Sequence, residues 1–337
     1  MNNVPFLRSL VMCGLVGVAA SFANAQTKSV QPMLLVVNQG DHDLSLVDPA
    51  AGRQIATVPV DGVTGHEVAA SPDGKTAYVP IYGDSGVGKP GTDGSKISVI
   101  DLASGKIVHT IDFGHGVRPH CAIYDRNSGM LYVTTELDKS VSIIDPKSLK
   151  IVGSVPTGQD QSHMLVLSRD GSRGYTANVG PGTMSVLDMK ARKTLAIIPI
   201  STDTQRISIS RDDSMVFTAD QTKPQLAVID TATNKLKMWV PLPAVGYGTA
   251  ATLDGRWLLV ALRTGKQVAV VDLKTMKVAR TIDVAGGPTE ILVSPDGKSA
   301  FVSCTRSKQV AQIDLESWEV SRLINAGSQA DGLAWAN

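Results

Sequence analysis

The 337-residue sequence has few aromatic residues and almost no net charge. Phenylalanine, tryptophan and tyrosine make up 4% of the chain, which is too few for a protein that stacks the bases of single-stranded nucleic acid on aromatic rings. The formal net charge is +1, so the chain also lacks the positive charge of a general polyanion binder. We therefore expect no nucleic-acid partner.

Long apolar runs are scarce as well. The one near the N-terminus, residues 10–20, follows Arg8 and precedes Ala23-Asn24-Ala25, the small-x-small pattern of a signal-peptidase site. It is too short to span a bilayer, which takes about 20 apolar residues, and no later run approaches that length. We expect residues 1–25 to be a signal peptide and residues 26–337 to be periplasmic or secreted, without membrane insertion.

Cysteine is scarce too. The sequence has three cysteines, and only Cys121 and Cys304 lie beyond the expected signal peptide. Cys13 is a poor lipidation site because Met12, and not a small residue, precedes it. The repeats described below put Cys121 and Cys304 in well-separated units, so we expect no internal disulfide even in an oxidising compartment. Packing must therefore supply the stability.

The sequence is rich, in contrast, in one repeat: alternating apolar residues that end in aspartate. The seven copies end at Asp48, Asp101, Asp145, Asp188, Asp230, Asp272 and Asp314. Their spacings are 53, 44, 43, 42, 42 and 42 residues, which is the period of four-stranded propeller blades. We predict an all-β, seven-bladed β-propeller that forms a single domain.

The order of strands within a unit predicts how the ring closes. Each unit reads as an innermost strand, a tight turn such as Ser71-Pro72-Asp73-Gly74, a second strand, a third strand with the aspartate and an outer strand. The chain starts with a second strand, residues 33–38, and ends with an innermost strand, residues 331–336. We expect these two strands to pair in one shared blade, which leaves no open sheet edge. The recurring aspartates are expected to close turns and not to catalyse.

The runs at residues 131–135 (LYVTT) and 141–145 (VSIID) resemble the YVTN-repeat β-propeller family, over essentially the whole mature chain. The asparagine of the namesake tetrapeptide survives only as Asn38 and Asn178. This resemblance implies a seven-bladed ring and frequent export, but its members have unrelated functions. Arg118-Pro119-His120 is also similar to propeller lactonases of the 6-phosphogluconolactonase and carboxymuconate-cyclase type.

Three histidines occupy equivalent positions in consecutive units, just before the innermost strand: His66, His120 and His163. The other units carry at this position Gln205, Tyr247, Thr289 and Ala330. In a propeller the position lies at the mouth of the central channel. Three neutral imidazoles there suit one divalent transition metal, zinc or copper above all, with an open position for water or substrate. Alternatively, the histidines line a hydrated channel without a ligand. Neighbouring repeats can inherit the same residue by duplication, without selection for a shared site.

Charged residues are predicted to surround this mouth. Glu67, Glu136 and Glu290 are the candidate catalytic residues, as a fourth metal ligand, a partner of a ligating histidine or a general base. The candidate substrate-binding residues across the ring are Arg206, Arg263, Arg306 and Tyr247. Arginine binds carboxylate or phosphate in a bidentate manner, and nearby lysines would add attraction, namely Lys223, Lys266 and Lys308. Ordinary solvated surface charge is the alternative.

The longest repeat contains a glycine-rich insertion, residues 83–94, beside His66. We expect a mobile loop, either a lid over the histidines or an untuned surface insertion. Cys121 follows His120, so strand alternation predicts that its side chain packs between blades, and the same is expected of Cys304.

Two functions stay open from these residues. The first is an exported, metal-dependent hydrolase, lyase or cyclase that acts on a small anionic molecule held by the arginines. The second is a non-catalytic binding or scaffold protein for a peptide, a cofactor or a partner protein.

Overall fold

The alternation within each repeat produces short antiparallel strands throughout the part of the chain that the structure describes. The structure is a computed structural model that describes residues 1–2, 32–84 and 86–337, so the predicted signal peptide lies almost entirely outside the described residues. The propeller comprises Pro32–Asn337. No helix of the described residues is long and apolar enough to cross a membrane.

The described strands are, in chain order, β1 (Met33–Asn38), β2 (Asp43–Asp48), β3 (Arg53–Pro59), β4 (Ala69–Ala70), β5 (Thr76–Gly83), β6 (Asp93–Asp101), β7 (Lys106–Asp112), β8 (Pro119–Asp125), β9 (Met130–Thr135), β10 (Ser140–Asp145), β11 (Lys150–Pro156), β12 (Ser162–Leu167), β13 (Arg173–Asn178), β14 (Thr183–Asp188), β15 (Lys193–Pro199), β16 (Thr204–Ile209), β17 (Met215–Asp220), β18 (Gln225–Asp230), β19 (Lys235–Pro241), β20 (Gly246–Ala251), β21 (Trp257–Leu262), β22 (Gln267–Asp272), β23 (Lys277–Asp283), β24 (Pro288–Val293), β25 (Ser299–Cys304), β26 (Gln309–Asp314), β27 (Glu319–Asn325) and β28 (Ala330–Ala336).

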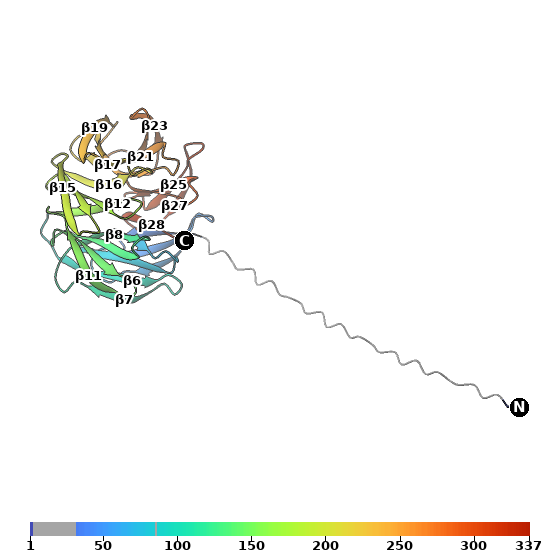
Figure 1. Cartoon of the computed structure of the whole chain (residues 1–337). Helices are drawn as coiled ribbons and strands as arrows, with labels where there is room; N and C mark the ends of the chain where they lie inside the picture. The colour runs from blue at the N-terminus through green and yellow to red at the C-terminus, as the bar shows by residue number, and fades with distance from the viewer. Residues whose placement is uncertain (3–31, 85) are drawn as a thin grey trace. The chain divides into compact units, whose positions relative to one another are not determined.

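These strands form seven four-stranded antiparallel sheets around a common centre, which confirms the predicted seven-bladed propeller (Figure 1). Blade 1 has the order β28-β1-β2-β3, and blades 2 to 7 follow in chain order as β4–β7, β8–β11, β12–β15, β16–β19, β20–β23 and β24–β27. The predicted closure is present, because Met33 of β1 lies opposite Ala336 of β28. The Trp335 indole also donates a hydrogen bond of 2.9 Å to the carbonyl of Val293 in blade 7, which ties the closing strand to the preceding blade.

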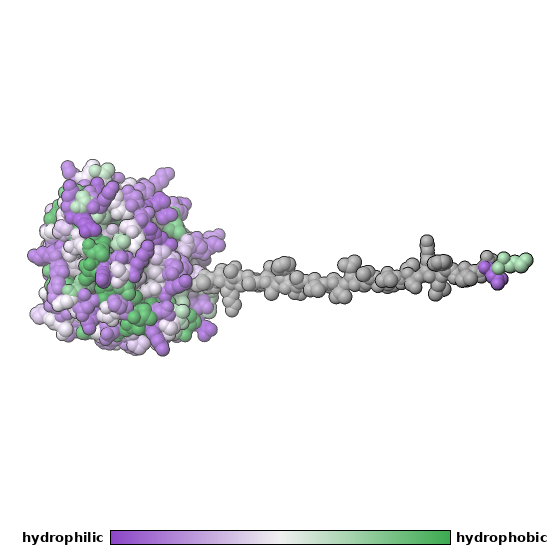
Figure 2. All heavy atoms as spheres, turned by 60° about the horizontal axis from the view of Figure 1, so that its bottom comes forward, coloured by the Kyte–Doolittle hydropathy of each residue, from purple (hydrophilic) through white to green (hydrophobic). Residues whose placement is uncertain are grey.

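The core lies between neighbouring blades. Second and third strands such as β1 and β2 are buried almost throughout, whereas fourth strands such as β3 are mostly exposed and form the rim. Several exposed apolar side chains belong to these fourth strands, among them Val108, Ile151 and Leu323. Figure 2 shows apolar surface in patches between hydrophilic residues on one face.

The two described cysteines are buried free thiols in different parts of this core. Cys121 packs with Tyr132 and Met164 in a cluster that spans blades 3 to 5. Cys304 belongs to another cluster with Leu259 of blade 6. Both side chains therefore pack between blades, as predicted, and burial raises the pKa of both thiols, that of Cys304 to about 11.

A β-bulge at the start of the innermost strand is the feature that builds the channel mouth. The register shifts there in blades 1 and 3 to 7; in blade 3, for example, Pro119 lies opposite Thr135 but Ala122 lies opposite Val133. The residues inside these bulges include His120, His163, Gln205, Tyr247, Thr289 and Asp331. A bulge re-aims the side chains that it contains, which here brings them to the mouth.

The bulge of blade 1 corrects one prediction. Ala330 of β28 pairs directly with Asn38, in the way that Pro119 pairs with Thr135 in blade 3. The residue equivalent to the histidines is therefore Asp331 and not Ala330. Alignment through the turn does not locate this residue, because in blade 1 the innermost strand β28 and the second strand β1 come from opposite ends of the sequence and no turn joins them.

Candidate functional site

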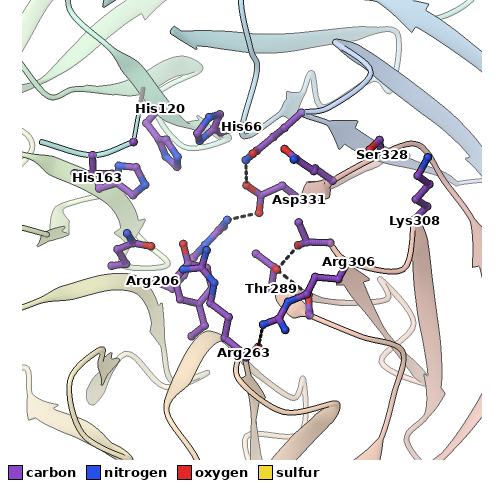
Figure 3. A pocket seen from close by; sticks show the side chains of 18 residues that line it. His66, His120, His163, Arg206, Arg263, Thr289, Arg306, Lys308, Ser328 and Asp331 are labelled. Atoms are coloured by element: carbon purple, nitrogen blue, oxygen red, sulfur yellow. Dashed lines mark hydrogen bonds and ion pairs between the residues drawn. The ribbon is translucent and has the colours of Figure 1, made fainter. Parts of the chain in front are cut away.

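The bulges surround a cavity of about 710 Å³ at the channel mouth. Seven predicted site residues line it: His66, His120, His163, Arg206, Tyr247, Arg263 and Arg306. The three predicted glutamates, Glu67, Glu136 and Glu290, are absent from its wall. Figure 3 shows the histidines grouped on one side of the cavity, with Arg263 and Arg306 on the other.

The histidines meet as predicted, but their rings pack against one another. The ring centroids of His120 and His163 lie 3.5 Å apart with a tilt of 32°, and those of His66 and His120 lie 5.1 Å apart. Among the described residues, the only group of three metal-ligand side chains whose ligand atoms all lie within 4.8 Å of one another is Glu67, Glu290 and Asp331. A metal ion shared by the three histidines therefore stays a prediction.

Hydrogen bonds to the backbone hold the histidines in place. Thr134 of β9 accepts a hydrogen bond from the Cys121 amide at 2.9 Å and donates one to the carbonyl of His163 at 2.8 Å, which links blades 3 and 4. The Gly332 amide donates to the His66 carbonyl at 2.9 Å. A Cβ atom at Gly332 would lie 2.4 Å from that oxygen, so this close approach requires glycine.

Burial keeps two of the imidazoles neutral. It lowers the pKa of His66 to about 4 and lowers that of His120 well below its usual value, with the neighbouring His163 adding to the second shift. The Nδ1 atom of His120 is buried and has no hydrogen-bond partner among the described residues. The histidine wall therefore offers unprotonated ring nitrogens at neutral pH, which suits a ligand that accepts a nitrogen lone pair.

A buried chain of side chains stands behind His163. The Tyr82 hydroxyl donates to Oε2 of Glu136 at 2.8 Å, and Oε1 of Glu136 contacts Nδ1 of His163. Tyr82 is fully buried and Glu136 is 2% exposed. The Tyr82 ring also packs against the rings of His66, His120 and His163, with centroid distances of 4.8, 5.4 and 5.9 Å.

Arg206 lies among three carboxylates from other blades. Its Nη1 atom lies 2.6 Å from Glu67 Oε1 and 2.5 Å from Glu290 Oε2, and its Nη2 atom lies 2.6 Å from Asp331 Oδ1. The same three carboxylates form the group of potential metal ligands, so the guanidinium already supplies a cation there. We call these four residues the Arg206 cluster; Gln39 adds a hydrogen bond to Asp331.

The electrostatics of the Arg206 cluster follow from burial. Burial alone would lower the pKa of Arg206, but Glu67, Asp331 and Glu290 outweigh it and raise that pKa well above its usual value. Burial raises the pKa of Glu67 and of Glu290, against the opposing effect of Arg206. Arg206, which was predicted to bind substrate, is therefore paired with carboxylates of the protein itself.

The opposite wall carries cations without such partners. Arg263, Arg306 and Lys308 line the cavity and make no ion pair with any described residue. The Arg263 guanidinium lies 4.2 Å from the centroid of the Tyr247 ring, and Arg306 donates to the Arg263 carbonyl at 2.9 Å. Of the three predicted lysines only Lys308 lines the cavity; Lys223 and Lys266 do not.

The glycine-rich insertion reaches the cavity, because Gly86 and Val87 line it. Arg118 anchors this loop: its Nε donates to Asp93 Oδ1 at 2.6 Å and its Nη2 donates to the Lys89 carbonyl at 2.7 Å. The loop therefore forms part of the cavity wall, while its role as a lid and its mobility stay predictions.

Tyr82 and Asp331 are not among the residues predicted for the site, although residue counts along the sequence locate both. Tyr82 lies eight residues after the turn glycine Gly74, as Arg263 lies eight residues after Gly255. Asp331 lies 17 residues after Asp314, which is the distance from Asp272 to Thr289.

Two family models match parts of the chain, each over less than half of it. The model of a YNCE-like beta-propeller matches residues 243–336, and that of the cytochrome D1 heme domain matches residues 125–252. No curated protein is similar enough to match the chain.

Solved structures share the fold. A chain of Kuenenia stuttgartiensis hydrazine synthase is 20% identical with a TM-score of 0.72, covering 84% of this chain and 92% of its own. A protein of unknown function from Desulfotomaculum acetoxidans is 12% identical with a TM-score of 0.73, covering 90% and 98%. The structure of the dihydro-heme d1 dehydrogenase NirN in complex with DHE is 14% identical with a TM-score of 0.64, covering 90% and 74%. The chain is a seven-bladed β-propeller. At these identities the likeness concerns the fold alone.

Proposed function

We propose that this protein binds a carboxylate-bearing ligand of cofactor size at the channel mouth, with a tetrapyrrole of the heme d1 type as the first candidate. The observation that carries the proposal is the asymmetry of the cavity. Imidazoles form one wall, and three cations without acidic partners form the other. A volume of about 710 Å³ falls within the range of cofactor sites.

The cationic wall supports an anionic ligand. Arginine and lysine side chains that share one cavity repel one another, and a bound carboxylate relieves this repulsion. The Tyr247 ring lines the cavity and packs against the guanidinium groups of Arg206 and Arg263, which holds Arg263 at the wall.

The residues fit a tetrapyrrole. The three imidazoles, with His66 kept neutral by burial, form a wall that suits the iron of such a group, and the cations opposite suit its carboxylates. The segment matched by the cytochrome D1 heme domain contains His163, Arg206 and Tyr247. When bound, heme supplies a redox-active iron; the chain's residues hold and orient it.

Binding is favoured over acid–base catalysis, because the three predicted catalytic glutamates have internal partners. Glu136 contacts Tyr82 and His163, while Glu67 and Glu290 contact Arg206. A divalent metal, zinc or copper, is the second cofactor to test at the histidines. Within the proposal, the protein is exported and does this binding outside the cytoplasm.

A spectroscopic titration with heme tests the proposal. The wild type should bind heme in a saturable way, and the R263Q/R306Q/K308Q variant should bind at least about tenfold more weakly, since each charge-assisted hydrogen bond contributes about 1.5–3 kcal/mol. The control is R53Q, which changes an exposed arginine at the start of β3. Equal affinity of wild type and triple variant would reject the cationic wall as the binding surface.

A further inference from the structure

We propose that Tyr82 and Glu136 are positioning residues that hold His163 in a single tautomer, with the proton on Nδ1 and the lone pair of Nε2 available to the ligand. His163 is then the histidine of the three that donates to the ligand at the mouth. This last step rests on the proposed function, whereas the tautomer is a property of the protein alone.

The chain of hydrogen bonds fixes the direction of donation. Glu136 has two carboxylate oxygens, and each has one partner: the Tyr82 hydroxyl at Oε2 and Nδ1 of His163 at Oε1. An ionised carboxylate only accepts hydrogen bonds, so Nδ1 must carry the proton that it shares with Glu136. Burial first, and then Glu136, raises the pKa of Tyr82, so the phenol keeps its proton and remains a donor.

The remaining ring nitrogen faces a different environment. His163 lines the cavity, and its Nε2 has no hydrogen-bond partner among the described residues. A carboxylate that accepts the Nδ1 proton orients the ring and makes the opposite nitrogen a stronger donor toward an electrophilic atom. The geometry therefore directs one lone pair from a fixed ring into the cavity.

The other two histidines lack this support. Neither His66 nor His120 makes a side-chain hydrogen bond to a carboxylate in the described residues, and Nδ1 of His120 is buried without a partner. The rings of His120 and His66 instead flank His163 and Tyr82 by packing. They shape the wall, and His163 alone has its tautomer set by a carboxylate.

The matched variants follow from the contacts. E136Q keeps the size of the side chain, but one of its two terminal atoms is an amide nitrogen, which donates. The amide oxygen can then accept the hydrogen bond of the Tyr82 hydroxyl while the amide nitrogen donates to Nδ1 of His163. We expect the population of His163 to shift toward the Nε2–H tautomer. Y82F removes only the hydroxyl and keeps the ring that packs on all three histidines, so Glu136 still accepts from Nδ1 and the tautomer should persist.

Imidazole ¹⁵N NMR at pH 8 measures the tautomer directly, in protein without added ligand. The proposal expects His163 as the Nδ1–H form in the wild type and in Y82F, with a shift toward Nε2–H in E136Q. A wild type with Nε2–H or with both nitrogens protonated overturns it, whether or not E136Q folds. An unchanged tautomer in folded E136Q also overturns it.

Heme serves as the probe for the role toward a ligand. H163A should lose the absorption spectrum of an imidazole-ligated iron, and added free imidazole should restore it, whereas H109A, which removes an exposed histidine of β7, should keep it. Retention of that spectrum in H163A would overturn the assignment of His163. Absence of any heme binding by the wild type would instead reject the proposed ligand and leave the tautomer result standing.

Discussion

Arg206 makes ion pairs with carboxylates from blades 2, 7 and 1, and all four side chains of the cluster are largely buried. A buried cation among carboxylates is costly to desolvate, so its pairing matters most when one partner is removed. In this protein the partners come from distant parts of the chain, and the cluster links blades across the ring. Arg206, which the sequence pattern assigned to substrate binding, therefore stabilises the ring by linking blades.

The first prediction concerns R206M. Removing the cation leaves buried carboxylates uncompensated, so the free energy of unfolding at neutral pH should fall by about 3–5 kcal/mol. Burial already raises the pKa of Glu67 and Glu290 in the folded protein. When the pKa of a carboxyl is higher in the folded than in the unfolded protein, the free energy of unfolding falls as pH rises above the unfolded pKa. Loss of Arg206 should raise the pKa of Glu67 and Glu290 in the folded protein further.

The deficit of R206M should consequently be larger at pH 8 than at pH 5. Urea denaturation at both pH values measures it, with R53M as the control for loss of an exposed arginine. Equal deficits at the two pH values would show that the carboxylates are not the reason for the loss.

Residues in this site differ in how readily a sequence predicts them. Identical residues at equivalent repeat positions, such as His120 and His163, can be recognised in the sequence. Because equivalent positions of a propeller lie around the same channel mouth, their proximity could be predicted. Tyr82 and Asp331 are chemically unlike the residues at equivalent positions, so only residue counts could find them. The stacking of two imidazoles and the pairing of Arg206 depend on side-chain rotamers and burial, which the sequence pattern does not contain.

At the scale of elements, the insertion between β5 and β6 is the part of the mouth that departs from the repeat. Arg118 binds it through the Asp93 carboxylate and the Lys89 carbonyl. Its guanidinium also lies 5.8 Å from the centroid of the Tyr82 ring, so the same side chain contacts the residue that packs on the histidines. The loop and the histidine wall are thereby linked through one residue.

The second prediction concerns R118Q, which removes both anchoring contacts. Because such charge-assisted hydrogen bonds contribute about 1.5–3 kcal/mol, amide exchange in residues 86–92 should accelerate about tenfold or more. Hydrogen exchange followed by mass spectrometry measures this, with K106Q at the exposed start of β7 as the control. Unchanged exchange in R118Q would mean that other contacts hold the loop.

Element order was the most predictable feature of the molecule. The aspartate that ends each third strand, from Asp48 to Asp314, recurs with little variation because each blade repeats one turn geometry. The bulges at the innermost strands were not predictable in the same way, since an extra residue in a strand leaves no mark on the apolar alternation. They nevertheless decide which side chains reach the mouth.

At the scale of the whole molecule, the ring is closed by pairing β1 with β28. This closure removes two sheet edges. It also places Asp331 of the last strand where it forms an ion pair with Arg206. Stability of the ring and composition of its mouth are therefore coupled through the same seven C-terminal residues.

The third prediction concerns deletion of residues 331–337. The truncated chain loses the partner of β1 and one carboxylate of the Arg206 cluster, so its thermal midpoint should fall by about 10 °C or more. Deletion of Asn337 alone, which lies beyond β28, is the control. A truncated protein that melts with the wild type would contradict closure by these strands.

A crystal structure of the protein grown with saturating heme tests the proposed binding site most directly. Electron density for the ligand should lie inside the channel mouth, with the iron near His163 and the carboxylates toward Arg263 and Arg306. Density at any other place on the protein, or an empty mouth at saturation, would contradict the proposed site.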